Sequence, residues 1–312
     1  MSSYLSDGGA NDMAFNLVPV QAGSRQISAV AQTISLSFSH DPLIRWLRPH
    51  APPWTRFQTD TYRWQYRRVR RAILDGMVFR SLSVTQLGDL VPLRDQKSKN
   101  LETISEHITD EGTDAGAAVL LVPPKKRLRW TMTRILYALK LWILDTLSPV
   151  PDNGGDKKRL ERMLRSHDLA LDNIKREYQI DNLWYLEVVA VHPSLQGRGL
   201  GSRVMNWVRE YTDNQPIVLE CTAERNVKFY ESLGFKVVEE IELTDSGETV
   251  RCWSQFQPLG LSKSVHATHI MARLPPVFEK IQQYLTVFIH FGMTITKGKA
   301  TSNDFFQTRV SI

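Results

Sequence analysis

The sequence has few cysteines, and this limits the class of protein. Its 312 residues include two cysteines, Cys221 and Cys252. That number excludes the disulfide framework that stabilises small secreted domains, and neither cysteine has the spacing from histidine that a metal site needs. We expect both thiols to be reduced side chains in the core of a cytoplasmic protein, with no bound metal.

Signals for membranes and nucleic acids are also missing. The first residues, MSSYLSDGGAND, lack the basic and apolar parts of a signal peptide, and no uninterrupted apolar run is long enough to span a bilayer. The formal net charge of +6 suits an anionic ligand. Because the basic residues form no recognised nucleic-acid motif, we expect no nucleic-acid partner.

The sequence does contain a glycine-rich segment between a strand and a helix. The run LWYLEVVAV, residues 183–191, predicts a buried strand, and apolar residues recur at helical spacing over residues 200–211. Glycines between such elements let backbone N–H groups converge on an anion at a helix N-terminus. The expected phosphate-binding loop consists of Gln196, Gly197, Arg198, Gly199, Leu200, Gly201 and Ser202, in which the arginine adds positive charge and the serine a hydroxyl.

Two other phosphate-binding patterns do not match this loop. A dinucleotide-binding loop of the Rossmann type has the spacing G-x-G-x-x-G, whereas this loop has G-x-G-x-G. The following strand, residues 217–221, also ends without an acidic residue suitably placed for a ribose. A Walker A loop is excluded because the Gly-Lys-Ser/Thr sequence is missing.

The segment QGRGLG resembles the Q/R-x-x-G-x-G/A signature of the GNAT superfamily of acyl-CoA N-acyltransferases. A second segment, NVKFYESLGFKVV at residues 226–238, is similar to a later motif of that family, in which a helix carrying a tyrosine ends at Gly-Phe. The resemblance implies an α/β fold with a mixed central β-sheet flanked by helices. In overall layout the chain is similar to uncharacterised fungal GNAT enzymes, some of which serve secondary metabolism.

The hydrophobic pattern divides the chain into a domain and two ends. We expect a disordered N-terminus over residues 1–14, a GNAT domain over residues 15–258, and a partly disordered C-terminal extension over residues 259–312. Within the domain, residues 85–114 form a polar insertion that is expected to be mobile, and residues 123–155 form a helical insertion. The remaining strands are expected at residues 15–20, 77–84, 115–122, 217–221, 235–243 and 249–257, and further helices at residues 27–38 and 56–74.

The resemblance implies direct transfer of an acetyl group from acetyl-CoA to an amine nitrogen within a ternary complex. The pantetheine arm would then lie along Val189, Ala190 and Val191, where the splay of the strand leaves an N–H group for the thioester oxygen. Tyr230 occupies the family position whose phenol protonates the departing CoA thiolate. Asn226 is assigned to the pantetheine or CoA side.

Glu187 is the candidate general base, because it is the only carboxylate in an otherwise apolar strand. It shares one face of that strand with Tyr185, which stands where some family members have the basic glutamate. A structural or substrate-orienting role for Glu187 stays open, as does a water chain that carries the proton. His192, beside Pro193, is expected to stabilise the turn rather than act as the base.

The helical insertion has three interpretations. Residues 130–147 predict a helix that is too short and too charged for a convincing membrane span. We favour a lid over the acceptor site, and an interfacial membrane helix and a partner-binding helix are the alternatives. The sequence does not indicate the oligomeric state.

The leading functional hypothesis is an N-acetyltransferase that acts on a small-molecule amine. A protein or peptide lysine acetyltransferase is the alternative within the enzymes, and a non-catalytic CoA-binding regulatory module is the alternative from another class. Neither the acceptor nor the length of the acyl chain is encoded in a pattern that can be read from the sequence.

Overall fold

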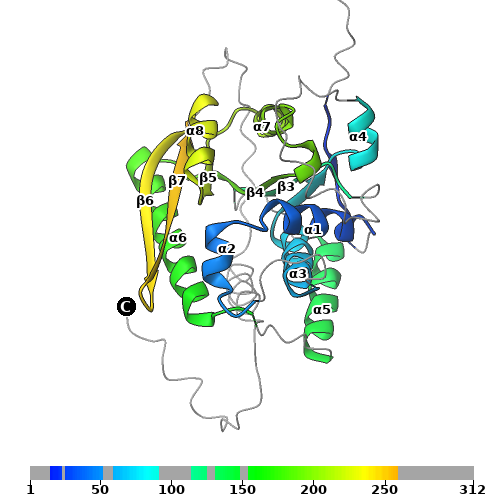
Figure 1. Ribbon diagram of the computed structural model, residues 1–312, viewed down its shortest axis with the longest axis horizontal. Coiled ribbons are helices and arrows are strands. Elements are labelled where there is room, and N and C mark those ends of the chain that lie inside the picture. The colour runs from blue at the N-terminus through cyan, green and yellow to red at the C-terminus, as the bar shows by residue number, and fades with distance from the viewer. Residues whose placement is uncertain are drawn as a thin grey trace, which may run out of the picture.

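A computed structural model describes residues 15–22, 25–51, 59–90, 114–124, 131–147 and 154–258. The expected N-terminal segment 1–14 and C-terminal extension 259–312 lie outside these residues. Seven strands form one sheet in the order β1-β2-β3-β4-β5-β7-β6 (Figure 1). The strands are β1 (Val18–Pro19), β2 (Met77–Arg80), β3 (Ala117–Val122), β4 (Trp184–Val191), β5 (Ile217–Cys221), β6 (Lys236–Asp245) and β7 (Glu248–Gln257).

The sheet is mixed, as expected for this α/β architecture. The pairs β1–β2, β2–β3 and β3–β4 are antiparallel, and the pair β4–β5 is parallel. Strand β7 is antiparallel to both β5 and β6. The hairpin turn between β6 and β7 has positive φ angles at Ser246 and Gly247, which is the backbone twist that a tight two-residue hairpin requires. The parallel pair lies at the centre, so the sheet changes its hydrogen-bonding pattern between β4 and β5.

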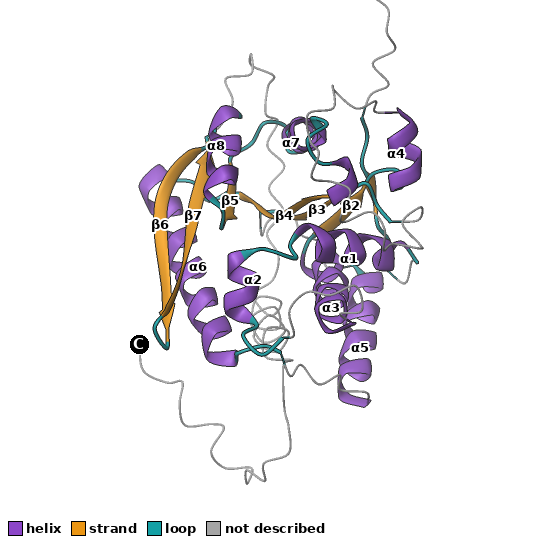
Figure 2. Cartoon of the chain, in the orientation of Figure 1, coloured by secondary structure: helices purple, strands orange, loops and turns teal. Residues whose placement is uncertain are grey.

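Helices cover both faces of the sheet (Figure 2). Helices α1 (Gln26–Ser37) and α3 (Thr59–Asp75) cover one face of β2 to β4, while α2 (Pro42–Leu47) and α6 (Lys157–Tyr178) cover the same face of the β5 to β7 part. Helices α7 (Leu200–Tyr211) and α8 (Glu224–Ser232) cover the opposite face. Both faces of the central strands are therefore buried, which agrees with their apolar sequences.

Two elements differ from the sequence-based expectation. The polar insertion was expected to lack packed structure from residue 85, but residues Val84–Leu90 form helix α4. Its Leu87 is 5% exposed and packs against Leu195 and Leu200 at the glycine-rich loop. This prediction was wrong for the start of the insertion, because two apolar side chains, Val84 and Leu87, suffice to attach a short helix to the rest of the domain. Residues 91–113 lie outside the described part of the chain.

Helix α6 was not predicted. Asp156 caps its N-terminus, because the carboxylate accepts hydrogen bonds from the backbone N–H groups of Lys158 and Arg159, and Gln179 caps its C-terminus in a left-handed conformation. Only part of the helix is buried, through side chains such as Ala170 and Ile174. Because charged residues outnumber apolar ones in α6, its hydrophobic pattern is too weak to predict the helix.

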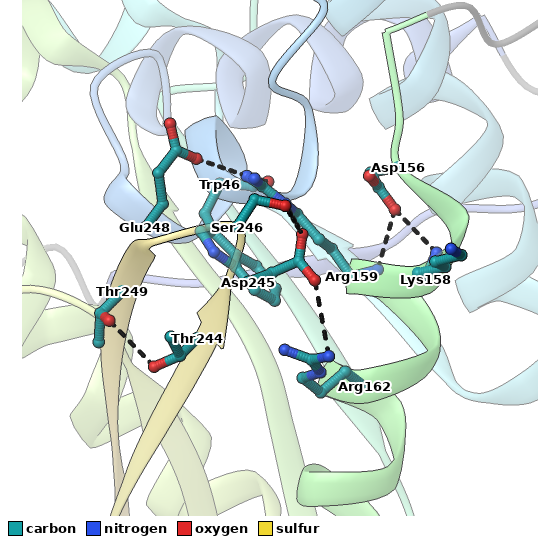
Figure 3. A network of polar contacts seen from close by, with 10 residues as sticks. All are labelled: Trp46, Asp156, Lys158, Arg159, Arg162, Thr244, Asp245, Ser246, Glu248 and Thr249. Atoms are coloured by element: carbon teal, nitrogen blue, oxygen red, sulfur yellow. Dashed lines mark hydrogen bonds and ion pairs between the residues drawn. The ribbon is translucent and has the colours of Figure 1, made fainter.

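Arg159 connects α6 to α2 and to the hairpin (Figure 3). Its Nε donates to Asp245 Oδ2 at 3.2 Å, and its Nη1 donates to Glu248 Oε2 at 2.7 Å and to the carbonyl oxygen of Trp46 at 2.9 Å. The guanidinium carbon lies 5.2 Å from the centre of the Trp46 ring. The side chain is almost fully buried, so one arginine holds three elements together.

The helix expected in the second insertion is present as α5 (Met132–Leu147). Tyr137 and Leu141 pack against Leu74 near the end of α3, and Arg71 of α3 pairs with Asp145 at 3.3 Å. These contacts lie at the C-terminal half of α3, and none of the contacts found for α5 involves the candidate site described below. The expectation of a lid thus gains no support from them. Within the described ranges, no helix is long and apolar enough to cross a membrane.

Candidate functional site

The glycine-rich loop enters α7 through two left-handed glycines. Gly197 has φ 76° and Gly199 has φ 77°, a region that favours glycine. A Cβ atom added at either position would meet no atom within 4 Å. The space beside the backbone at both glycines is therefore open, directly before the N–H groups of the first turn of α7. This geometry fits a phosphate group.

The other residues of the loop differ in burial and in their contacts. Gly201 lies close to α8, because an added Cβ would be 3.2 Å from Cζ of Phe229. Leu200 is 1% exposed and packs in the core. The backbone N–H of Gln196 donates to the carbonyl oxygen of Pro193, so it is less suited to a phosphate than we expected. Arg198 and Ser202 lie half-buried at the loop and the helix start.

His192 fixes the strand end of the loop. Its Nδ1 lies 2.7 Å from Oγ of Ser194 and 3.3 Å from the backbone N–H of Ser194. The ring is 1% exposed, and this burial lowers its pKa to about 4. A neutral ring that accepts from the following turn agrees with the expected structural role.

The pKa of His192 predicts that acid weakens the fold. In the unfolded chain a histidine has a pKa of about 6.5, so the unfolded state binds more protons between that pH and about pH 4. His192 therefore lowers the free energy of unfolding as the pH falls through this window, by about 2 kcal/mol at pH 5. Urea unfolding at pH 7 and pH 5 measures the loss, which should shrink in His192→Asn.

The pKa of His167 is shifted in the opposite direction from that of His192, so His167 serves as the control for this experiment. Burial opposes charging of its ring, but the hydrogen bond and the charge of Glu220 outweigh burial and raise its pKa. Its contribution is present below the unfolded pKa and is lost as the pH rises through the folded pKa. A His167 variant should therefore steepen the loss on acidification, and equal profiles for both variants would contradict the assignment.

A β-bulge interrupts β4 at Glu187. Leu120 of β3 pairs with Val188, whereas the next residue, Leu121, pairs with Leu186, which leaves Glu187 without a partner on β3. The parallel pairing of β4 with β5 covers residues 184–186 and ends at the same point. Beyond the bulge, β4 continues through Val189, Ala190 and Val191 to the glycine-rich loop without β5 as a paired neighbour.

Tyr230 lies on α8, on the face of the sheet that α7 also covers. Its ring packs edge-to-face against Phe229 and Phe235, at centroid distances of 5.1 and 5.8 Å. Burial raises the pKa of the phenol, and the thiol of Cys221 at the end of β5 adds to the shift. The phenol therefore stays protonated at neutral pH and can donate a proton. Asn226 lies one turn earlier on α8, half-buried.

Glu187 does not stand alone, as the sequence suggested, but pairs with an arginine. Nε of Arg68 on α3 donates to its Oε1 at 2.7 Å, and both side chains are about three-quarters buried. Arg68 also lies 5.9 Å from the ring centre of Trp64. The ion pair fixes the direction of the Glu187 side chain.

A second group of polar side chains, which we call the His167–Glu220 cluster, lies beside Glu187 on the face covered by α3 and α6. Oε1 of Glu220 lies 3.1 Å from Nδ1 of His167, and Oε2 accepts from the Tyr185 hydroxyl at 3.5 Å. The rings of His167 and Tyr185 are 4.7 Å apart. Burial first, and then the charges of Glu220 and Glu187, raise the pKa of Tyr185. The cluster consists of Tyr185, His167 and Glu220.

Asp41 contributes a further carboxylate near this cluster. It caps the N-terminus of α2 by accepting from the backbone N–H of Ile44, and it accepts a hydrogen bond from Thr222, just beyond β5. Burial raises its pKa, although these hydrogen bonds and the charge of Arg68 oppose the shift. Asp41 therefore links the start of α2 to the end of β5.

The sequence missed Arg68, His167, Glu220 and Asp41 as site residues. Glu220 could have been found, since it is the lone carboxylate in the apolar strand IVLEC, as Glu187 is in β4. His167 belongs to a helix that was not predicted, and Arg68 is one of five arginines on α3. Their participation depends on which helix faces meet the sheet. Within the described ranges, no group of three or more His, Cys, Asp or Glu could hold a metal ion.

Part of the chain is similar in sequence to known proteins. The acetyltransferase (GNAT) domain family matches residues 169–237, which include β4, the glycine-rich loop and Tyr230. A protein named acetyltransferase from Stachybotrys chartarum is 30% identical over 130 residues, covering 37% of this chain and 55% of that protein. The match thus spans about half the length of that relative. Residues 169–237 of this chain are thus similar to the acetyltransferase domain of the GNAT superfamily.

Solved structures with a similar arrangement include two insect enzymes. A polyamine N-acetyltransferase from Drosophila melanogaster is 16% identical with a TM-score of 0.45, and the match covers 78% of this chain and all of that chain. An arylalkylamine N-acetyltransferase from Aedes aegypti is 14% identical with a TM-score of 0.46, again covering 78% of this chain and all of that chain.

Proposed function

We propose that this protein is an acetyl-CoA-dependent N-acetyltransferase that acts on a small-molecule amine. The observation that carries the proposal is the end of β4–β5 pairing at the Glu187 bulge. On one face of the sheet, Tyr230 and the residues that lead to the glycine-rich loop, Val189 and Val191, pack against the core cluster that contains Leu186. On the other face, the end of the pairing adjoins Glu187 and the His167–Glu220 cluster. A donor and an acceptor approaching from opposite faces would meet there.

The glycine-rich loop supplies the donor site in this proposal. Gly197 and Gly199 leave room for the pyrophosphate of CoA, the first turn of α7 supplies N–H groups, and Arg198 adds positive charge. The pantetheine arm would pair with the backbone of residues 189–191, as a strand would. One N–H group of the same stretch would stabilise the thioester oxygen as it becomes negative.

The proton and bond changes balance with residues of this chain. The ammonium group of the acceptor gives a proton to Glu187 or, through the His167–Glu220 cluster, to Glu220. The free amine attacks the thioester carbon, so that a C–N bond forms and the C–S bond breaks, and the nitrogen gives its second proton to water. The Tyr230 phenol protonates the departing thiolate and is reprotonated from solvent. Carboxylates on the acceptor side also favour a cationic amine over a neutral acceptor.

Two measurements test the proposal. Acetyl-CoA should raise the melting temperature, and a panel of small amines should give acceptor-dependent release of free CoA thiol. Release only with basic peptides would support a protein lysine acetyltransferase instead. Stabilisation by acetyl-CoA without thiol release for any amine or peptide would support a CoA-binding module, and an unchanged melting temperature would contradict the donor site.

Replacing Gly199 with alanine should weaken CoA binding. The left-handed backbone costs alanine about 1 kcal/mol, and the new methyl group projects into the open side of the loop. We expect the Kd for CoA, measured by calorimetry, to rise about tenfold. Gly247→Ala is the matched control, because Gly247 has φ 82° and equally open space in the β6–β7 turn. An equal loss in both variants would show a general effect of strain.

A further inference from the structure

Helix α5 has an unusual surface for a helix of a water-soluble domain. Of the fourteen exposed large hydrophobic side chains in the described part of the chain, eight lie on this one helix. They are Met132, Ile135, Leu136, Leu139, Trp142, Ile143, Leu144 and Leu147, with exposed fractions between 38% and 78%. An exposed apolar patch of this kind marks an interaction surface.

The helix is held so that this apolar side faces outward. Tyr137 and Leu141 are the only buried side chains of this helix among the described residues, and both pack against α3. Near its start, Nη2 of Arg134 donates to the carbonyl oxygen of Gly76 at 3.1 Å, and near its end Asp145 pairs with Arg71. Polar contacts at both ends thus fix the orientation, and Figure 2 places α5 at the periphery beyond α3.

The surroundings of the apolar side are basic. Helices α3 and α5 together carry seven cationic and three acidic side chains. Arg63 on α3 and Lys140 on α5 are exposed. The formal charge of this helix pair is therefore +4, with Arg68 paired to Glu187 and Arg71 paired to Asp145. The exposed apolar side includes Trp142, and exposed arginine and lysine side chains lie on the same two helices. This combination suits a partner with an apolar interior and an anionic surface.

We propose that α5 is a peripheral binding surface for an anionic lipid bilayer. The apolar side chains, with Trp142 among them, enter the boundary between headgroups and acyl chains, while the exposed cations of α3 and α5 contact the lipid phosphates. The helix lies in the plane of the interface and does not cross the bilayer, in agreement with its length and charge.

Vesicle flotation of the full chain tests this surface. We expect the protein to float with vesicles of phosphatidylcholine containing about 30% phosphatidylserine, and to bind pure phosphatidylcholine vesicles at least about tenfold more weakly. Binding to the anionic vesicles should fall as salt is added. The double variant Leu139→Ser with Trp142→Ser should lose at least about tenfold in vesicle affinity.

The controls separate lipid binding from other effects. Leu169→Ser removes a side chain that is 64% exposed on α6, so it alters exposed apolar area without touching α5 and should leave binding unchanged. Circular dichroism checks that each variant is folded. The proposal is overturned if the wild type does not float with anionic vesicles, or if the α5 variant floats as well as the wild type. Self-association that the α5 variant abolishes, without flotation of the wild type, would instead identify α5 as an interface between two copies.

Discussion

Replacing Tyr230 with phenylalanine is expected to lower kcat about 100-fold while changing the Kd for acetyl-CoA less than about twofold. The phenol is the proton donor that we assign to the departing thiolate, and its raised pKa keeps the proton available at neutral pH. Phenylalanine retains the packing against Phe229 and Phe235. Steady-state thiol release with an identified acceptor gives kcat, and calorimetry gives the Kd.

The matched control for this variant is Tyr211→Phe. Tyr211 stacks on Trp207 on α7, and its hydroxyl contacts the sulfur of Met77 rather than the candidate site. The Tyr211→Phe variant should leave kcat unchanged. If Tyr230→Phe retains the wild-type kcat with a verified acceptor, the phenol is a packing residue and the thiolate is protonated by water.

Replacing Arg159 with leucine is expected to lower the free energy of unfolding by about 3 kcal/mol. The leucine retains part of the apolar volume but leaves the carbonyl oxygen of Trp46 and the carboxylates of Asp245 and Glu248 without their shared donor. The cost is moderated because Glu248 is 64% exposed and regains water. Urea unfolding followed by circular dichroism measures the change.

Arg162→Leu provides the comparison on the same helix. Arg162 pairs with Asp245 at 3.5 Å, but its side chain is 45% exposed, so the pair contributes less than about 1 kcal/mol. The Arg159→Leu variant is therefore expected to lose about three times as much free energy of unfolding as the Arg162→Leu variant, or more. Equal losses would mean that burial of Arg159 adds nothing beyond an ordinary surface ion pair.

The parts of the site that could be predicted are those formed by consecutive residues. The strand, the glycines and α7 follow one another in the chain, and the helix that carries Tyr230 ends at Gly234, which has φ 88°. Local backbone requirements identify such segments because the same few residues carry both the pattern and the geometry. The pairing of Ala117 with Val191 then attaches this segment to the rest of the sheet.

The remaining parts depend on contacts between distant residues. Arg68 reaches Glu187 across more than a hundred positions, and His167 reaches Glu220 from a helix whose sequence is mostly polar. Nothing in the alternation of β4 indicates that Glu187 is an extra residue, because a bulge becomes visible only when the partner strand is known. Pattern reasoning therefore located the glycine-rich loop and the helix that carries Tyr230, and it missed most of the polar side chains around Glu187.

The bulge at Glu187 has a consequence for how this site could arise or be lost. Strand geometry repeats every two residues, so a β4 shorter by that one residue would match β3 throughout and could stay paired with β5 to its end. Such a sheet would gain backbone hydrogen bonds and would close the place where donor and acceptor are proposed to meet. Deletion of Glu187 would then give a more regular sheet without the proposed meeting point, but it would leave the largely buried Arg68 without its carboxylate partner.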